Sequence, residues 1–501
     1  MAAAVERSPG GRHRLALAAG LLAAAFVATR LALTWRFPWF VDETIFASFA
    51  KEVHGDVGNL FIAEIDKKGL LPSWLGATLI GLGIDPITAM RLLACTGAAA
   101  AAAFGGLLMR RLYGAREAIL TAALVAIGPF FLVTASVGVY DAMTTGLVAG
   151  AVLVSLRLLQ RPRPYTALLL GAMLGAGALT KPTAWVAAFV LPFTLLLFDR
   201  AAPHARRRFL LWLGHAALAV AVGYGLSCIA RLTPLYDMPM KVPNQRAPGE
   251  ALDDLLPTLR ANWRPLWNGL LGYLTLPGML LAALGAVVAW RRHRAAAGML
   301  AIWTAAVLVS ALLLPLTEYP RYFATAVVPL SGFAAIGALA GWDAIAGGAW
   351  ASPPVRRTAA VAAAVVAVLP AALFGARVLA DPERASYPGL DQVQYVTATS
   401  AQIWVDPVAD EIERRGGPYP VHVDTGTAYP WGLELRLNGD AVGTKRRYDV
   451  FQNGTRAQRG RARWLISDGS DGATSPLPGF RLVRRIARSD RGAVMRLYER
   501  I

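Results

Sequence analysis

Charged residues are scarce in this sequence. Asp, Glu, Lys and Arg together make up 16% of its 501 residues, whereas hydrophobic residues make up 55%. Soluble domains usually carry charge on about a quarter of their residues. The shortage excludes an ordinary soluble protein, and with a mean hydropathy of +0.45 it indicates a membrane protein that crosses the bilayer several times.

Acidic residues are scarcer than basic ones, so the formal net charge is +18. A surplus of this kind can indicate a nucleic-acid partner, but its distribution along the chain argues against one. The Arg and Lys residues cluster between apolar segments, where the cytoplasmic loops of membrane proteins carry them. The charge therefore favours a lipid bilayer as the partner and no nucleic acid.

Cysteine is almost absent. Only Cys95 and Cys228 occur, and both lie within apolar segments, which favours packed thiols over a disulfide or a metal pair. The sequence also has no P-loop, dinucleotide fingerprint or nucleophile elbow in a suitable context. A site for a nucleotide sugar on the inner face is therefore unsupported.

Long apolar runs account for most of the chain. A helix needs about 20 mostly apolar residues to cross the hydrocarbon layer. The first run is longer than the apolar part of a signal peptide, so we expect an uncleaved span with a cytoplasmic N-terminus. In all we expect about 11 transmembrane helices, near 15–33, 88–108, 117–136, 142–159, 165–180, 183–198, 209–230, 268–290, 296–315, 322–342 and 358–379.

The segment Leu70–Gly83 decides the orientation of these helices. It is short and contains Pro72, so we expect it to lie at the outer interface, within a first outer loop over 34–87. The basic loops that follow then all fall on the cytoplasmic side, as the positive-inside rule requires. A crossing at Leu70–Gly83 would place every one of them outside.

The chain changes character near Asp381. We expect a transmembrane domain over 1–380 and a small soluble α/β domain over 381–501, outside the plasma membrane of a bacterium. Short β-like runs separated by Gly, Pro, Asn and Asp predict strands, and one helix is expected. The strands are Tyr419–Val423, Arg463–Ile466, Leu482–Ala487 and Ala493–Tyr498, and the helix is Asp406–Arg414.

Four short motifs occur in the order and topology of a known superfamily. They are Asp42-Glu43 after the first span, Lys68-Gly-Leu-Leu-Pro72, Tyr140-Asp141 at the start of a span, and LTKPTA at 179–184. Over roughly 10–340 the sequence resembles the GT-C glycosyltransferases, most of all the branch of protein O-mannosyltransferases and aminoarabinose transferases. The resemblance implies a polytopic GT-C-like fold and a polyprenyl-phosphate-linked sugar donor. The family often has Lys-Pro-Pro-Leu at 68, so the donor-side loop is expected to differ in shape.

Carboxylates at the outer helix ends are the candidates for catalysis and acceptor binding. Glycosyl transfer to a hydroxyl needs a base for its proton, and the resemblance implies Asp42, with Glu43 orienting Asp42 or the acceptor. Asp42 could instead cap the helix that follows, and Glu43 could simply favour the helix dipole. Asp141, with Tyr140, is a candidate for binding acceptor or sugar, and Asp141 too could be a cap.

Cations on the same face are candidates for binding the donor phosphate, namely Lys68, Lys181 and Arg321. Lys181 and Arg321 could instead extend from helix ends towards water. The sequence requires no cofactor. Asp42, Asp141 and His54 are weak candidates for a divalent metal, although a lone His in a loop is more often a polar surface group.

These observations predict a membrane glycosyltransferase. It would move a hexose or pentose, with inversion, from a polyprenyl-phosphate donor to a glycan, lipid or protein acceptor on the outer face. A transporter or flippase for lipid-linked sugars is an alternative, but it would place charges near mid-membrane and usually has paired repeats. A non-catalytic membrane scaffold that binds glycans is the third alternative.

Overall fold

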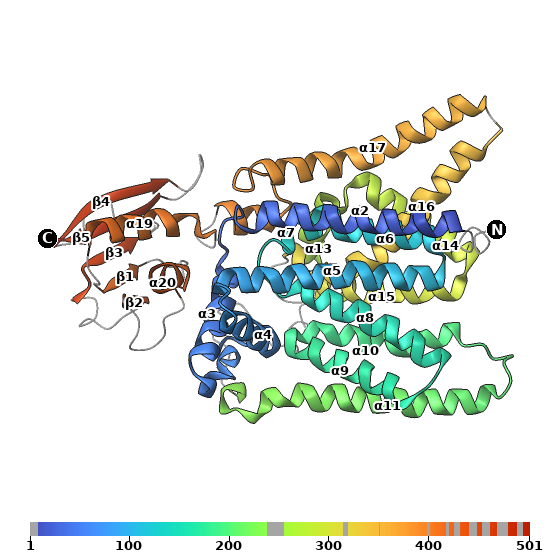
Figure 1. The fold of residues 1–501 in the computed structure, drawn as a ribbon, viewed down its shortest axis with the longest axis horizontal. Helices are drawn as coiled ribbons and strands as arrows, with labels where there is room; N and C mark the ends of the chain where they lie inside the picture. Colours follow the sequence, from blue (N-terminus) through green and yellow to red (C-terminus); the bar gives the residue numbers. More distant parts are fainter. Residues whose placement is uncertain are drawn as a thin grey trace.

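The computed structural model places a small sheet domain at one end of a bundle of long helices (Figure 1). The N-terminal end of the bundle lies at the opposite end of the molecule from the C-terminus. The structure describes residues 9–237, 255–313, 319–349, 351–397, 401–416, 420–424, 431–439, 448–452, 461–467, 479–487 and 494–501.

Among these described residues, six helices are long and apolar enough to cross a membrane, or up to seven if a bent pair counts as one span. The six are α5 (Pro86–Leu112), α8 (Asp141–Gln160), α11 (Ala205–Ser227) with η5 (Cys228–Leu232), α15 (Arg294–Leu313), η7 (Pro320–Ala326) with α16 (Val327–Gly347), and α17 (Pro353–Ala380). The predicted polytopic helical fold is thus confirmed, while the number 11 stays a prediction.

The bent pair consists of α13 (Leu255–Leu274) and α14 (Leu276–Arg292), which meet at an angle of 94°. Thr275 lies at the bend with φ of 62°, and its hydroxyl accepts the Gly278 N–H, which starts α14. The predicted span 268–290 is therefore not one straight helix. The apolar pattern runs through the bend because both arms are apolar.

The remaining apolar ranges form shorter helices or helices with breaks. Gly128 and Pro129 interrupt the predicted span 117–136. The range 183–198 forms short pieces, the last of which has Pro192 in its first turn. The elements are α2 (Pro9–Thr34), α6 (Ala115–Ile127), α7 (Pro129–Thr134), α9 (Pro164–Thr180), η3 (Pro182–Trp185), α10 (Val186–Val190) and η4 (Leu191–Leu197).

Helices α5 and α8 are in backbone contact. A Cβ atom added to Gly97 would lie 2.4 Å from the Met143 nitrogen, and one added to Gly146 would lie 2.6 Å from the Gly97 oxygen. Only glycine permits this approach. It fixes the start of α8, which carries Asp141, beside α5.

Four short helices follow α2 and lie across the end of the bundle that faces the sheet domain (Figure 1). They are α3 (Val41–Gly55), η1 (Val57–Asn59), η2 (Ile62–Asp66) and α4 (Leu70–Gly81). Helix α3 is buried along most of its length because the bundle lies on one side of it and the sheet domain on another.

The C-terminal domain is a five-stranded sheet with strand order β2-β1-β3-β5-β4. The pairs β1–β2 and β1–β3 are parallel, and β3–β5 and β4–β5 are antiparallel. The predicted small α/β domain is thus confirmed. Its elements are β1 (Val421–Asp424), β2 (Val450–Gln452), β3 (Trp464–Ser467), β4 (Phe480–Ala487), β5 (Val494–Arg500), α19 (Val405–Arg415) and α20 (Trp431–Asn438), preceded by α18 (Leu390–Gln392), η8 (Val393–Thr397) and η9 (Gln402–Trp404).

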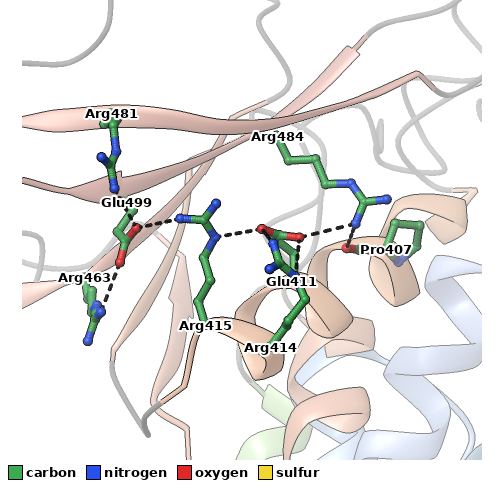
Figure 2. A network of polar contacts seen from close by, with 8 residues as sticks. All are labelled: Pro407, Glu411, Arg414, Arg415, Arg463, Arg481, Arg484 and Glu499. Carbon is green, nitrogen blue, oxygen red and sulfur yellow. Dashed lines mark hydrogen bonds and ion pairs between the residues drawn. The ribbon is translucent and has the colours of Figure 1, made fainter.

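Charged side chains join α19 to the sheet (Figure 2). Arg415 donates to Glu411 at 2.7 Å on its own helix and to Glu499 of β5 at 3.1 Å. Arg484 of β4 pairs with Glu411 at 3.6 Å, and Arg463 donates to Glu499 at 3.0 Å. Networks of this kind fix geometry better than isolated surface pairs do.

The sheet domain docks on α3 through a buried ion pair. Lys51 of α3 donates to Glu434 of α20 at 2.9 Å, and their side chains are 1% and 9% exposed. Trp431 packs against Phe49 beside this pair. A buried pair fixes one relative position of the two groups, because neither charge can leave its partner without a desolvation penalty.

Candidate active site

Five of the predicted site residues come together at the end of the bundle beside α3. They come from five separate segments: α3, the turn before α4, the start of α8, the end of α9, and η7. The residues are Asp42, Lys68, Asp141, Lys181 and Arg321.

Asp42 lies between two cations. Its Oδ2 is 2.7 Å from Nη2 of Arg321, and its Oδ1 is 3.6 Å from Nζ of Lys68. Burial raises the pKa of Asp42, but the charges of Lys68 and Arg321 oppose burial and lower the pKa to about 2. In turn, the Asp42 carboxylate raises the pKa of Lys68. Asp42 is therefore ionised and Lys68 positively charged at neutral pH.

The alternative of Asp42 as a helix cap is wrong. Helix α3 begins at Val41, its N-cap residue is Phe40, and the Phe40 N–H is 3.4 Å from Oε2 of Glu43. Asp42 is thus inside the first turn, and its carboxylate faces cations. Asp141 is likewise the first residue of α8 rather than its cap, which is Tyr140.

Asp141 and Lys181 form a second ion pair, with Oδ1 and Nζ 2.6 Å apart. Helix α9 ends at Thr180 because Pro182 disfavours a helical conformation for the residue before it. Lys181 accordingly has extended backbone angles, φ −159° and ψ 130°, and its ammonium lies 4.9 Å from the centre of the Tyr322 ring. The proline of the LTKPTA motif thus positions the lysine.

Gly69 allows the segments that carry Lys68 and Lys181 to lie in direct backbone contact. A Cβ atom at this residue would lie 2.0 Å from the Thr180 carbonyl oxygen. The backbone beside Lys68 is therefore pressed against the backbone beside Lys181. This contact gives a physical reason for the glycine that distinguishes Lys68-Gly-Leu-Leu-Pro72 from the usual family motif.

Arg321 is held in an aromatic setting and is 7% exposed. Its guanidinium lies 5.0 Å from the ring centre of Tyr319, 5.4 Å from that of Phe40 and 5.9 Å from that of Tyr322. Within the described part of the chain, its buried Nη1 has no hydrogen-bond partner. Arg321 therefore keeps one donor nitrogen available beside Asp42. Glu318, which could have paired with it, lies outside the described residues.

Tyr140 is buried, and its ring packs next to the cluster instead of adding a polar group to it. Its ring stacks on Phe46 with the centres 3.8 Å apart, and Lys68 lies 5.4 Å from the centre of the Phe46 ring. Burial raises the pKa of Tyr140. Tyr140 thus packs against the same aromatic ring that Lys68 contacts.

Glu43 is not brought to the cluster. It is fully buried and forms an ion pair with Arg91 of α5, which also donates to the carbonyls of Thr34 and Phe37. The pair fixes the turn that leads from α2 into α3. The sequence prediction missed Arg91, although an arginine inside an apolar span is itself a signal.

The residues suggested for a metal do not fit a divalent ion. His54 is exposed near the other end of α3, about 18 Å along the helix axis from Asp42. Asp42 and Asp141 each face a cationic side chain, which would repel a metal ion. No group of three or more His, Cys, Asp and Glu residues suited to a metal occurs among the described residues.

The linker before the sheet domain contributes residues that the sequence prediction missed. Tyr395 packs edge-on against Phe40, with ring centres 5.1 Å apart. Asp391 is fully buried, and its Oδ2 accepts the hydroxyl of Tyr273 at 2.5 Å. Burial, against the opposing effect of this hydrogen bond, raises the pKa of Asp391 to about 7. No motif marks these residues, because the linker is irregular in sequence.

A groove of about 480 Å³ opens beside the cluster. It shares Lys68 and Gly69 with the cluster and continues between α4, α9 and the end of α11. Its walls combine cations with apolar and aromatic side chains, including Lys67, Lys68, Arg231, Leu70, Leu179, Trp185 and Tyr236. A groove lined by both cations and apolar side chains suits an amphipathic anion.

One protein-family model matches part of this chain. Residues 67–224 match the family model of dolichyl-phosphate-mannose-protein mannosyltransferases. The match includes Lys68, Asp141 and Lys181, but neither Asp42 nor Arg321. A sequence comparison with curated proteins finds no match.

Solved structures share the fold over nearly the whole chain. ArnT from Cupriavidus metallidurans in the apo state has a TM-score of 0.55 at 16% identity, covering 96% of this chain and 97% of that one. The same protein bound to undecaprenyl phosphate gives 0.54 at 17% identity, with the same coverage. The oligosaccharyltransferase AglB from Archaeoglobus fulgidus, in complex with an inhibitory peptide and a dolichol-phosphate, gives 0.55 at 14% identity, covering 92% and 70%.

The sequence identities of these matches, 14–17%, are low, so the matches show a shared fold. The resemblance predicted from the four sequence motifs is therefore confirmed: the chain is a multi-pass membrane protein with the GT-C fold.

Proposed function

We propose that this protein is a glycosyltransferase that moves a sugar from a polyprenyl-phosphate donor to an acceptor at the outer face of the membrane. The observation that carries the proposal is the cluster of Lys68, Lys181 and Arg321 around Asp42 and Asp141, at the mouth of an amphipathic groove. A polyprenyl phosphate has one anionic end and a long apolar tail, which matches the two parts of this site.

The cations would bind the donor phosphate. Arg321 has a buried nitrogen without a partner among the described residues, and Lys68 lies where the cluster meets the groove. A guanidinium can hold two phosphate oxygens at once, whereas an ammonium acts as a point charge. The three cations also stabilise the phosphate as it leaves, since its negative charge grows when the bond to the sugar breaks.

Asp42 would take the acceptor proton. The acceptor oxygen bonds to the anomeric carbon, the bond from that carbon to the phosphate oxygen breaks, and the electron pair leaves with the lipid phosphate. Attack from the side opposite the phosphate inverts the anomeric carbon. With a pKa near 2, Asp42 is a weak base while it faces both cations. A phosphate that draws Arg321 and Lys68 to itself raises the proton affinity of Asp42, so base strength depends on donor binding.

Asp141 is proposed to bind a hydroxyl of the sugar or the acceptor, with Tyr140 supporting it from below. The cytoplasmic side is proposed to be the end of the bundle that carries the basic loops, because the positive-inside rule favours that orientation. The sheet domain then lies outside. The proposed mechanism does not use the divalent metal that was considered for Asp42, Asp141 and His54.

The experiment is a transfer assay on purified Asp42→Asn. The change preserves size and removes the capacity to accept a proton, so we expect transfer to fall at least about a hundredfold. Binding of polyprenyl phosphate to the protein should persist, because the cations remain. The matched control is Asp56→Asn, an exposed aspartate at the far end of α3, which should retain wild-type transfer.

Transfer by Asp42→Asn within a few-fold of wild type would remove Asp42 from the role of base, and Asp141 would be the next carboxylate to test. Normal donor binding without any transfer by the wild-type protein, over a broad set of acceptors, would instead favour a lipid-sugar carrier or scaffold.

A further inference from the structure

A second pocket lies at the end of the bundle that carries the N-terminus, opposite the sheet domain. Its volume is about 310 Å³. It is formed where α5 and α8 end, where η4 ends, and where the chain passes from α14 into α15. Helix α8 separates it from the site described above. Asp141 begins that helix and Gln160 ends it, so the two places are about 29 Å apart along its axis.

The lining of this pocket combines two basic side chains and Gln160 with aliphatic and aromatic ones. Arg111 and His293 supply the basic groups, while Leu112, Leu156 and Phe198 contribute apolar surface. A phospholipid presents the same combination, since a charged headgroup adjoins apolar chains. Basic pockets between transmembrane helices are a recurrent form of site for anionic headgroups.

Arg111 has no acidic partner in the part of the chain that the structure describes. Arg157 on α8 acts on Arg111 as a like charge, and the two repel. Other arginines at this end do have partners: Arg116 pairs with Asp343 at 3.0 Å, and Arg292 pairs with Glu117 at 3.3 Å. Among the described residues, the pocket thus contains a cation without an acidic partner.

The surroundings reinforce this positive charge. The segments 110–117, 157–163, 199–208, 291–294 and 343–357 contain 15 arginines and only three acidic residues. A surface of this kind attracts anionic headgroups at the membrane surface. The positive potential of these segments raises the local concentration of anionic lipids. The pocket is a place where one of these lipids can bind in a defined position.

We propose that this pocket binds an anionic phospholipid, with its phosphate beside Arg111 and His293 and its first methylene groups against the leucine and phenylalanine side chains. The ligand belongs to the leaflet that adjoins this end of the bundle. The proposal is independent of the glycosyltransferase assignment, because the pocket shares no residue with the Asp42 cluster or its groove.

The experiment compares lipid binding to the full-length protein, purified in detergent and freed of lipid. Binding of dioleoylphosphatidylglycerol and of dioleoylphosphatidylcholine is measured by native mass spectrometry and by the rise in Tm. We expect the anionic lipid to bind at least tenfold more tightly than the zwitterionic one. The variant Arg111→Gln/His293→Gln should lose at least tenfold of that affinity.

The matched control is Arg206→Gln/Arg207→Gln. Both arginines are exposed on α11 at the same end and neither lines the pocket, so affinity for the anionic lipid should stay within about twofold of wild type. Equal binding of the two lipids, or an equal loss in the control variant, would overturn the proposal in favour of a general surface field. A Tm rise of the same size with inorganic phosphate alone would identify free phosphate, rather than a lipid, as the ligand.

Discussion

At the scale of single residues, Asp391 stands apart because it is a fully buried acid in the linker between the two domains. Its folded-state pKa is about 7, whereas the ordinary value is 3.8. Between these two values the folded state binds more protons than the unfolded state, so stability falls as the pH rises through this window. Above about pH 7 the loss is complete.

Asp391→Asn should remove this pH dependence. The amide oxygen can still accept the Tyr273 hydroxyl, and the side chain carries no charge that burial would penalise. We expect a higher Tm than wild type above pH 7, and a difference that disappears near pH 4. Tm measured between pH 4 and 9 tests this, with the exposed Asp199→Asn as control, and parallel curves for wild type and Asp391→Asn would contradict it.

The residues of the site differ in how readily the sequence predicts them. Asp42, Lys68 and Lys181 belong to short motifs, and their positions beside apolar runs place them at one membrane face. Whether a carboxylate faces backbone N–H groups or a cation depends on a partner distant in sequence, as Arg321 is from Asp42. The cap alternative could be excluded only with the fold in hand.

At the residue scale, the sequence prediction overlooked the meaning of an arginine within an apolar span. Arg91 lies inside a predicted span, where an uncompensated charge is costly, so a partner had to exist. The sequence could have predicted the need for that partner, but not that Glu43 fills it. The separate role of Glu43 therefore became clear only from the fold.

At the scale of elements, the contact between Gly69 and Thr180 sets the distance between two cationic segments. Gly69→Ala places a Cβ atom 2.0 Å from a backbone oxygen, so one of the two segments must shift. We expect at least a tenfold loss of affinity for polyprenyl phosphate, because Lys68 and Lys181 then no longer face one ligand. Binding measured in detergent tests this expectation.

The control for this change is Gly214→Ala on α11, where a Cβ atom meets nothing within 4 Å. Alanine favours a helix over glycine by up to about 1 kcal/mol, so this variant should bind normally and be as stable as wild type or slightly more stable. Normal donor binding by Gly69→Ala would mean that the turn before α4 adapts without moving the lysines.

The arrangement of elements also predicts topology. In a background without Cys95 and Cys228, a cysteine at Val57 or Leu232 should react with an impermeant thiol reagent added to intact cells, and one at Ala201 should not. Val57 and Leu232 are 71% and 75% exposed, and Ala201 is exposed between η4 and α11. Labelling at Ala201 alone would reverse the proposed orientation.

Helices were predicted far better than their breaks. Apolar length alone gives the position of a buried helix, but the bend at Thr275 depends on a hydroxyl cap inside an apolar run. In the sheet domain, short β-like runs between Gly, Pro, Asn and Asp predicted β1, β3, β4 and β5, and the helix expected at Asp406–Arg414 is α19. Strand β2 has three residues and α20 has eight, which is too little periodicity to stand out from the loops.

At the scale of the whole molecule, the pair of Lys51 and Glu434 couples the sheet domain to the helix that carries Asp42. Lys51→Met removes the positive charge beside a buried carboxylate. Loss of one partner of a buried pair typically costs about 3–5 kcal/mol, so we expect a lower Tm and protease cleavage between the two domains. Limited proteolysis of the purified protein measures this.

The variant Lys51→Met/Glu434→Leu removes both charges and should recover most of the lost stability, because well-packed apolar residues can replace a buried ion pair. Its transfer rate then reports whether docking alone positions Asp42. If Lys51→Met were as stable and as protease-resistant as wild type, the pair would not be what holds the domains together.

The docking of the sheet domain also has a consequence for biogenesis. The packing partners of the segment around Asp42 lie far later in the chain, with Tyr395 against Phe40 and Glu434 against Lys51. A ribosome therefore finishes every long helix of the described chain before it makes the residues that pack against Phe40 and Lys51. A chain halfway through insertion would lack these contacts of α3, so we expect the proposed transfer at Asp42 only after the sheet domain has folded.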